Sequence, residues 1–385
     1  MIKSARKLAA IALVGAVAAV LAACTTSTGK GAVEQSSGAS DYKLPAAGQK
    51  LLDEAMAQPK WTPPSSSPAP AKNKLVVAIP CDAAAVGCSR PAQAFLDAAK
   101  ALGWKTQLID PQSDPQKMQA ALKQAMQEGA NAVYAPGPNV AQFSAALLAQ
   151  ARAQGIVMAT QGAHTEPLGP NGWNLVVNNE YGQRSPGLAA WVANDSGGTG
   201  QVLVIDNSEF LGTHTGPVNF DKTLKQICDK CKVADTLDLA VADVSTSLPA
   251  RIKASLQANP NINYIYSPFD FASVSIISAV EQAGFANKVK VVGIDGNPQN
   301  IQLLKQGRQA ATYATAADLW SWEVADNVNR IFQGQAPVAK NGIIDDYPSQ
   351  LFDTKHQPSA SAAKNGWNGG IDYQADYKKL WASGS

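Results

Sequence analysis

Histidine is scarce in this chain, and the motifs that mark common catalytic sites are missing. The three histidines are His164, His214 and His356, and none lies at metal-ligand spacing from a cysteine. The sequence also has no Gly-x-Ser-x-Gly elbow, no His-Glu-x-x-His pair and no phosphate-binding loop. We therefore expect no metal site and no cofactor, and the sequence favours a binding protein over an enzyme.

Charge is also sparse, and neither sign dominates. Lys and Arg number 32 against 30 Asp and Glu, and charged residues make up 16% of the chain. A protein that binds nucleic acid would carry a clear basic excess, so we expect no nucleic acid as a partner. Hydrophobic residues reach 45%, which is typical of a globular protein with a large interior.

The N-terminus carries a short apolar run. Lys3, Arg6 and Lys7 precede the apolar residues 8–21, and a Leu-Ala-Ala-Cys motif ends at Cys24. A basic start, a short apolar segment and small residues before a cleavage site are typical of an export signal, and the run is too short for a membrane span. The motif resembles a bacterial lipobox, which implies lipidation of the Cys24 thiol. The alternative is an ordinary signal with an unrelated cysteine.

The cysteines number five, and an odd count in an exported protein leaves one without a pairing partner. Lipidation of Cys24 would account for it. The other four form two local pairs, Cys81/Cys88 and Cys228/Cys231, and an oxidising compartment permits both disulfides. The second pair also has redox spacing, but it falls at the end of an expected helix, where the helix dipole favours the thiol over the thiolate. We interpret it as structural.

Composition divides the chain into segments. Residues 1–23 form the expected signal peptide, and residues 24–73 are rich first in Ser, Thr and Gly and then in Pro, which predicts a flexible tether with a short helix near 51–56. The remainder is long enough for two lobes rather than one core. The tail 359–385 contains aromatic residues, so we expect it to pack on a lobe.

From residue 75, short apolar runs alternate with amphipathic ones. We expect strands at 75–79, 105–109, 132–135, 156–160, 175–177, 201–205, 264–266, 289–294 and 310–314. We expect helices at 90–102, 115–128, 140–154, 185–192, 219–230, 248–258, 273–283, 300–305 and 319–332. Repeated strand–helix units predict an α/β fold with parallel sheets and right-handed crossovers, and the two successive series predict two similar lobes.

Four segments carry a resemblance to a known family. They are Leu102-Gly103-Trp104 ahead of Ile109-Asp110, residues 127–133 (Gln-Glu-Gly-Ala-Asn-Ala-Val), Gly293-Ile294-Asp295-Gly296 and Leu304-Lys305-Gln306-Gly307. Over residues 74–352 the chain resembles the periplasmic sugar-binding proteins of the ribose-binding type, whose domain also forms the effector module of LacI repressors. Residues 61–88 resemble a subgroup of exported lipoproteins.

The resemblance implies a type I periplasmic binding protein, with two Rossmann-like lobes and parallel sheets joined by a three-strand hinge. The chain would cross between the lobes near Val177, Thr315 and Ile344, and ligand would close the cleft between them. The lobes would comprise 74–176 plus 316–343 and 177–315 plus 344–385.

Asp295 ends the apolar run 289–294, at the carboxyl edge where open α/β sheets bind ligands. The resemblance implies that its carboxylate accepts hydrogen bonds from sugar hydroxyls, for which it offers several acceptor sites. The alternative is that Asp295 only caps the helix that follows at Asn297-Pro298.

The resemblance suggests further ligand contacts, with departures from the family pattern. Phe269 and Asp270 stand where the family usually shows Asn-Asp, Gln161 where Asp-Arg is common, His214 near a usual Arg and Thr315 at a usual Gln. Asp82 and Ser89 complete the expected set. The first loop lacks the usual stacking aromatics, so Phe269 or Phe271 would supply the aromatic surface.

We interpret the chain as a monomeric, non-catalytic solute-binding lipoprotein of an ABC-type importer. It would bind a sugar or sugar-like polyol, deliver it to permease subunits and be held in the cell envelope by its lipid anchor. The alternative is an envelope sensory module that passes the same closure to a receptor kinase or chemoreceptor.

Overall fold

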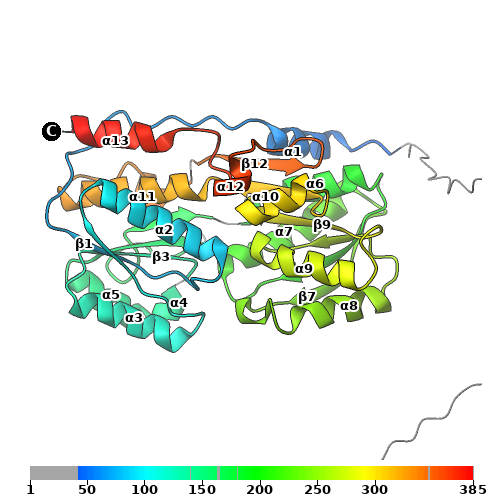
Figure 1. Ribbon diagram of the computed structural model, residues 1–385, viewed down its shortest axis with the longest axis horizontal. Helices are drawn as coiled ribbons and strands as arrows, with labels where there is room; N and C mark the ends of the chain where they lie inside the picture. The colour runs from blue at the N-terminus through cyan, green and yellow to red at the C-terminus, as the bar shows by residue number, and fades with distance from the viewer. Residues whose placement is uncertain (1–41, 139, 163–164, 180, 346, 385) are drawn as a thin grey trace, which may run out of the picture. The chain divides into compact units, whose positions relative to one another are not determined.

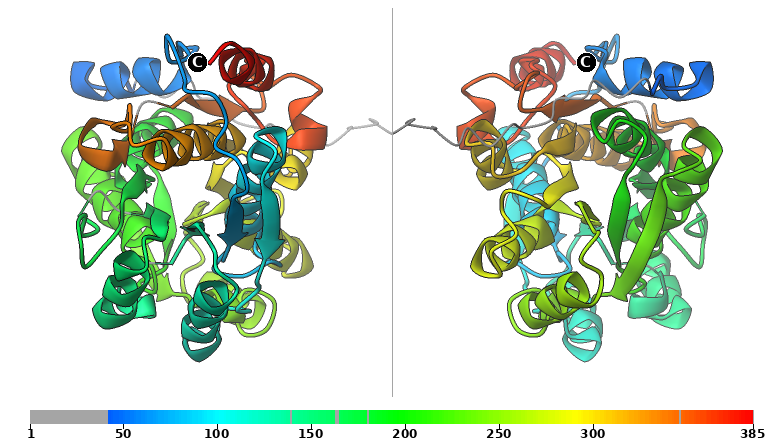
Figure 2. Two further views of the ribbon diagram at one scale, coloured as in Figure 1. Left: turned by 90° about the vertical axis from the view of Figure 1, so that its left-hand side faces the viewer. Right: turned by 90° about the vertical axis from the view of Figure 1, so that its right-hand side faces the viewer.

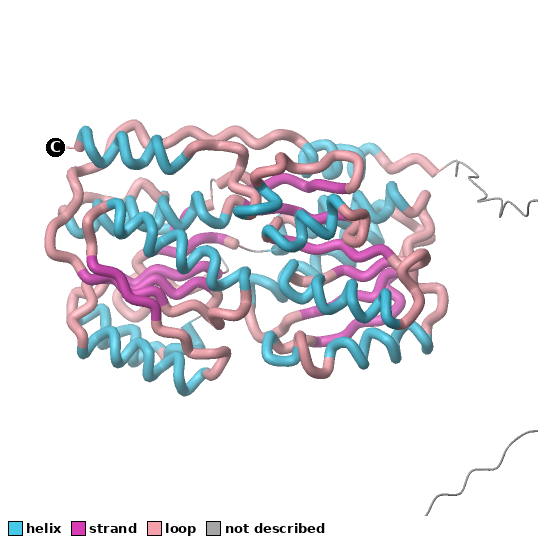
Figure 3. The backbone as a smooth tube through the Cα atoms, viewed as in Figure 1, coloured by secondary structure: helices cyan, strands magenta, loops and turns pink. Residues whose placement is uncertain are grey.

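The computed structural model describes residues 42–384 apart from positions 139, 163–164, 180 and 346. The expected signal peptide and Cys24 lie outside the described residues. Within them the chain builds two α/β lobes, each around a six-stranded sheet, as Figures 1 and 3 show.

The sheet of the first lobe is parallel throughout, with strand order β11-β5-β4-β3-β1-β2. Its strands are β1 (Leu75–Ala78), β2 (Lys105–Leu108), β3 (Ala132–Pro136), β4 (Val157–Gly162), β5 (Leu175–Asn178) and β11 (Ile343–Ile344). Its helices are α2 (Val86–Ala101), α3 (Pro115–Gln127), α4 (Val140–Phe143), α5 (Ala145–Ala153) and α11 (Ala317–Phe332), with the short turn η3 (Lys340–Gly342). Val76 and Ala78 face α2 and α11, while Val77 and Ile79 face α3 and α5. Helices therefore cover both faces, which explains why strands such as β1, β3 and β5 are mostly apolar runs.

The sheet of the second lobe has the order β12-β10-β9-β8-β6-β7. Its strands are β6 (Gln201–Asp206), β7 (Lys232–Asp238), β8 (Tyr264–Tyr266), β9 (Lys290–Asp295), β10 (Ala311–Thr315) and β12 (Ser349–Asp353). Its helices are α6 (Ser185–Asp195), α7 (Leu211–Ile227), α8 (Leu248–Ala258), α9 (Asp270–Gln282) and α10 (Pro298–Lys305), with the short turns η1 (Tyr181–Gln183) and η2 (Val241–Asp243). The edge strand β12 runs antiparallel to β10, which departs from the expected all-parallel sheet.

Between the two sheets the chain crosses three times. It leaves the first sheet after β5 at Asn178, leaves the second after β10 at Thr315, and leaves the first again after β11 at Ile344. These points lie at or next to the crossings expected from the sequence. The predicted fold class, two Rossmann-like lobes joined by three hinge segments, is confirmed.

Some elements differ from those the sequence predicts. The strand β7 was not predicted, because this edge strand mixes polar and apolar residues, none of them fully buried, instead of forming an apolar run. Helix α7 begins at Leu211 rather than 219, although Gly216 and Pro217, both poor helix formers, lie inside it. The predicted helix 140–154 is interrupted at Ser144, which has φ 60° and accepts a hydrogen bond from the backbone N–H of Leu147 at 3.3 Å.

The segment 42–73 is packed on both lobes, which corrects the expectation of a flexible tether for this part of the chain. Helix α1 (Ala46–Met56) packs on α6 and β12 of the second lobe. The segment then continues to the first lobe, where Asn329 accepts a hydrogen bond from the N–H of Ala71 at 2.9 Å and the indole of Trp104 donates to the Ala71 carbonyl at 2.8 Å. The proline-rich chain thus pairs its backbone with side chains of the lobe. Figure 1 shows it running along one side of both lobes.

The C-terminal tail also packs on the body of the protein. It contains α12 (Ala362–Asn365), which packs on α10, and α13 (Tyr373–Ser383), which packs on α11. The rings of Trp381 and Trp322 stack with centroids 5.3 Å apart. The expected packing of the tail aromatics is therefore observed, but α13 lies on the first lobe and not on the second, to which 344–385 was assigned. The end views in Figure 2 place α1 and α13 on the same side of the sheets.

Candidate ligand-binding site

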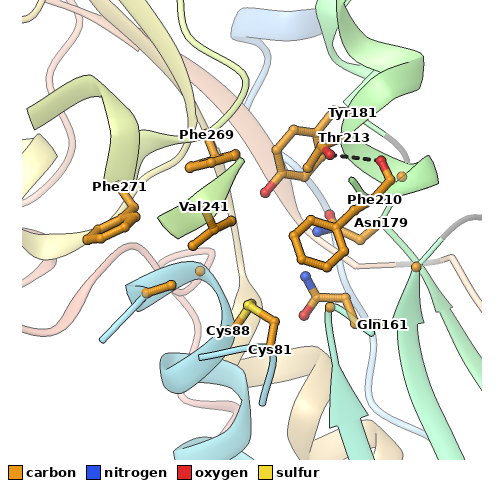
Figure 4. A pocket seen from close by; sticks show the side chains of 15 residues that line it. Cys81, Cys88, Gln161, Asn179, Tyr181, Phe210, Thr213, Val241, Phe269 and Phe271 are labelled. Carbon is orange, nitrogen blue, oxygen red and sulfur yellow. Dashed lines mark hydrogen bonds between the residues drawn. A yellow bond between two sulfur atoms is a disulfide. The ribbon is translucent and has the colours of Figure 1, made fainter. Parts of the chain in front are cut away.

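A cleft lies between the lobes, and it is lined by residues near the carboxyl ends of strands from both sheets. This is the edge of the sheet at which α/β folds bind ligands. The first lobe contributes Cys81, Ala85, Gly87, Cys88, Gly137, Gln161 and Gly162. The second lobe and the first crossing contribute Asn179, Tyr181, Phe210, Gly212, Thr213, Val241, Phe269 and Phe271. Figure 4 shows these side chains arranged around a common space.

A disulfide forms one wall of the cleft. Cys81 and Cys88 are joined at a Cα separation of 5.7 Å, and the loop between them leads from β1 into α2. Gly137 is required beside it, because a Cβ at this position would lie 2.8 Å from Sγ of Cys88 and the backbone has φ 97°. The second expected pair, Cys228–Cys231, is also a disulfide and lies just after α7, away from the cleft lining.

Aromatic rings supply much of the remaining surface. Phe269 precedes α9 and lines the cleft together with Phe271. That one of them provides an aromatic surface for the ligand stays a prediction. Phe210, which precedes α7, was not foreseen. It follows the end of β6 as Phe269 follows the end of β8, so the carboxyl-edge rule could have identified it.

Four polar side chains line the cleft, and three of them form hydrogen bonds with other residues of the protein. The Tyr181 hydroxyl donates to Oδ1 of Asp295, Thr213 donates to Oδ1 of Asn207 at 2.7 Å, and Asn179 accepts from Tyr347 at 3.4 Å. Gln161 is different. Its side chain is 7% exposed, and none of the described residues lies within hydrogen-bonding distance of its Oε1.

Asp295 is buried behind Tyr181, and it does not line the main cleft. Its Oδ2 accepts from the backbone N–H of Asp270 and from Asn297, both at 3.3 Å. It borders a smaller adjoining cavity, which Gln161 also borders. The residue at the start of the following helix α10 is Asn297, so the structure does not support the alternative that Asp295 caps that helix.

Two features mark Asp295 as an unusual residue. Its φ is 132°, a region that L-residues rarely adopt and that is often associated with functional sites. Burial, reinforced by the negative charge of Asp270, raises the pKa of Asp295 to about 7. The hydrogen bonds from Tyr181 and from the backbone of Asp270 lower this pKa, but by less than burial and the Asp270 charge raise it.

Asp270 is buried, and its hydrogen bonds connect the segments around Asp295. Its carboxylate accepts hydrogen bonds from Gly296 N–H at 2.8 Å, from Thr312 at 2.8 Å and from Gln309 at 2.9 Å. It is fully buried, and burial raises its pKa to about 6. These contacts give Asp270 a position in the framework rather than in the cleft lining.

The other expected contacts are placed differently by the structure. His214 is paired with Asp206 at 2.9 Å, and Asp82 accepts from Ser113 at 2.9 Å, so both side chains are directed to partners outside the cleft lining. Ser89 lies in α2 and is also outside the lining. Thr315 borders only the smaller cavity near Asp295. Of the eight expected ligand contacts, Gln161 and Phe269 are the ones that line the main cleft.

Two α/β lobes, three crossings and a cleft lined from both sides define a bilobed ligand-binding protein. The sequence profile described as periplasmic binding protein domain matches residues 77–336, and the chain belongs to this family. The resemblance inferred from the sequence is confirmed, and membership implies an exported protein.

Relatives and solved structures agree with this assignment. Over 81 residues the chain is 37% identical to the D-allose-binding periplasmic protein of Escherichia coli (strain K12), a match that covers 21% of this chain and only about a quarter, 24%, of that protein. A sugar ABC transporter structure from Yersinia enterocolitica has a TM-score of 0.69 at 15% identity, covering 83% of this chain and 99% of that one. A solute-binding protein from Agrobacterium vitis with bound allitol has a TM-score of 0.65 at 19% identity, covering 74% and 96%. At these identities the structures show the shared fold.

Among the residues that the structure describes, no helix is both long enough and apolar enough to cross a bilayer. Over the same residues, no group of three His, Cys, Asp or Glu side chains is arranged to hold a metal ion.

Proposed function

We propose that this protein is the solute-binding component of an ABC-type importer and that it binds a sugar or sugar-like small molecule between its lobes. The observation that carries the proposal is the cleft lined from both lobes at the carboxyl edges of their sheets. A ligand that contacts both walls stabilises the closed arrangement of the lobes over the open one.

The mechanism follows from the three crossings. The segments 178–181, 315–317 and 344–349 connect lobes that each have their own sheet, so rotation about these segments moves the sheets relative to each other. Ligand shifts the population toward closure, and the permease recognises the closed form. The protein performs no chemistry on its ligand in this scheme.

The comparisons support a transport role. The similar structures include solute-binding proteins of ABC transporters solved with allitol and D-arabinose. They give no support to the sensory alternative. We further propose that the N-terminal signal is cleaved before Cys24, that this cysteine carries the lipid anchor and that the protein acts as a monomer beside its permease.

A thermal unfolding screen tests the binding function. A ligand that binds only the folded state adds about 2.7 kcal/mol of stability at a hundredfold excess over its Kd. We expect at least one neutral sugar or sugar derivative to raise the unfolding temperature without being consumed. Consumption of the compound would indicate an enzyme, and the absence of any shift across the sugars and polyols would contradict the proposal.

A further inference from the structure

The described lining of the cleft is rich in apolar surface. No charged side chain is found among the described residues that line it. Figure 4 shows Phe269, Phe271 and Val241 on one side and Phe210 facing them, with the Cys81–Cys88 disulfide between the two sides.

The two charged residues that border the smaller adjoining cavity, Asp295 and Arg90, are paired inside the protein. Asp295 receives the hydroxyl hydrogen of Tyr181. Arg90 is bound to Asp318 at 2.8 Å and donates to the backbone carbonyl of Trp367 at 2.6 Å. Among the described lining residues a charged solute would find no ionic partner to replace the water it leaves, which is strongly unfavourable.

Hydroxyl groups would also find few side-chain donors among the described lining residues. The hydroxyl hydrogens of Tyr181 and Thr213 are already donated to Asp295 and Asn207. A fully hydroxylated hexose buried here would exchange several hydrogen bonds to water for contacts with aromatic rings and a disulfide. Each hydroxyl left unpaired weakens binding, whereas apolar ligand surface gains from the same walls.

Gln161 is the exception among the lining residues. It is more than nine-tenths buried, its side chain faces the cleft in Figure 4, and its Oε1 lacks a partner among the described residues. A buried acceptor without a donor is costly, so a ligand that donates a hydrogen bond at this point removes that cost. An amide oxygen is a neutral acceptor and calls for no charge on the ligand.

From these observations we propose that the solute is a neutral sugar derivative with a substantial apolar part, such as a 6-deoxy sugar or an aryl glycoside, and that Gln161 accepts a hydrogen bond from its polar end. The proposal rests on the binding function proposed above and specifies the class of ligand. The phenylalanine walls hold the apolar part, and Gln161 fixes its orientation.

Titration calorimetry with matched compounds tests the proposal. The series comprises a hexose, its 6-deoxy derivative, its phenyl β-glycoside and its uronate, each on the gluco, galacto and manno scaffolds. We expect the 6-deoxy compound or the phenyl glycoside to bind at least tenfold more tightly than the parent hexose, and the uronate to bind at least tenfold more weakly than the parent.

The outcomes separate this inference from the proposed function. Tightest binding of a parent hexose or a uronate overturns the apolar, neutral class and leaves the binding function intact. Binding of none of the compounds overturns the proposed ligand class, and the thermal unfolding screen across sugars and polyols then decides the binding function.

Substitutions test the two kinds of contact. For the tightest compound, Gln161→Leu should weaken binding at least tenfold, and Phe269→Leu should selectively reduce the advantage of the apolar compounds. Gln226→Leu, at an exposed position on α7, is the matched control and should bind as the parent protein does. Thermal unfolding without ligand shows whether each variant is folded, and unchanged binding by a folded Gln161→Leu removes Gln161 from the proposal.

Discussion

The hydroxyl of Tyr181 donates a hydrogen bond to Oδ1 of Asp295, and both side chains are buried. Tyr181 stands in the cleft lining, whereas the carboxylate it binds lies behind it. The family resemblance predicts that the Asp295 carboxylate binds sugar hydroxyls. In the structure it instead accepts a hydrogen bond from a residue of its own chain. This arrangement removes a charge from the cleft surface and places Tyr181 between Asp295 and the ligand space.

Replacing Tyr181 with Phe tests this arrangement. The substitution leaves Oδ1 of Asp295 without its hydroxyl donor, and an unsatisfied buried acceptor costs about 1 to 3 kcal/mol. We expect the free energy of unfolding, measured by urea titration, to fall by that amount at pH 7.5. The matched series is Asp295→Asn and the double variant Y181F/D295N. If the pair interacts as described, the two single effects will not be additive, and strict additivity would contradict the contact.

The buried carboxylates predict an unusual dependence of stability on pH. The pKa of Asp295 is raised from 3.8 to about 7 and that of Asp270 to about 6, by burial first of all. Between pH 4 and 7 the folded state therefore holds protons that the unfolded state has released, so the free energy of unfolding decreases as pH rises through this window.

Urea titrations at pH 4.5, 6.0 and 7.5 check this dependence, with Asp295→Asn as the comparison. The variant cannot ionise at this position, so we expect its stability to vary less over the range. If the free energy of unfolding changes by the same amount in the wild type and in the variant between pH 4.5 and 7.5, the pKa of Asp295 is not raised.

The repeated strand–helix pattern was sufficient to predict the fold. Buried strands such as β3 and β9 are apolar runs because helices cover both faces of each sheet, and this pattern is visible in the sequence. The edge strand β7 lacks it and was not predicted. The packing of residues 42–73 was also missed, because it depends on hydrogen bonds to residues such as Asn329, more than 250 positions away in the chain.

The candidate site was less predictable than the fold. The family resemblance suggested Gln161 and Phe269 as ligand contacts, and both residues line the cleft. Position along a strand did not predict which side chains turn toward the ligand, because that depends on contacts between distant residues. Asp295 is held by Tyr181, 114 positions earlier in the chain, and His214 is turned toward Asp206 at the end of β6.

The two disulfides are expected to have different effects on binding. Each closes a short loop, and by chain-entropy reasoning each contributes about 2 to 3 kcal/mol to stability. Only Cys81–Cys88 lines the cleft, where it restrains the loop before α2. We expect C81S/C88S to weaken binding of the tightest compound in the hexose series, while C228S/C231S lowers stability without changing affinity. Calorimetry and urea titration of both variants measure the two effects, and equal losses of affinity would contradict a specific role for Cys81–Cys88.

Asp326 on α11 joins the N-terminal segment and the C-terminal tail to the first lobe. Its fully buried carboxylate accepts hydrogen bonds from Ser67, from the Trp381 indole at 2.9 Å and from Arg330 at 2.9 Å. Asp326→Ala would leave the buried Arg330 without this partner, a change that typically costs about 3 to 5 kcal/mol.

We therefore expect D326A to lower the free energy of unfolding by several kcal/mol and to release both terminal segments. Limited proteolysis should then cut around residues 57–72 and 359–372 before the lobes themselves are cleaved. Asp97→Ala, which removes an exposed carboxylate 3.2 Å from Lys100 on α2, is the control and should cost less than about 1 kcal/mol. If D326A is cleaved no faster than D97A, the terminal segments are held by contacts other than Asp326, most directly those that Asn329 makes with Pro68 and Ala71.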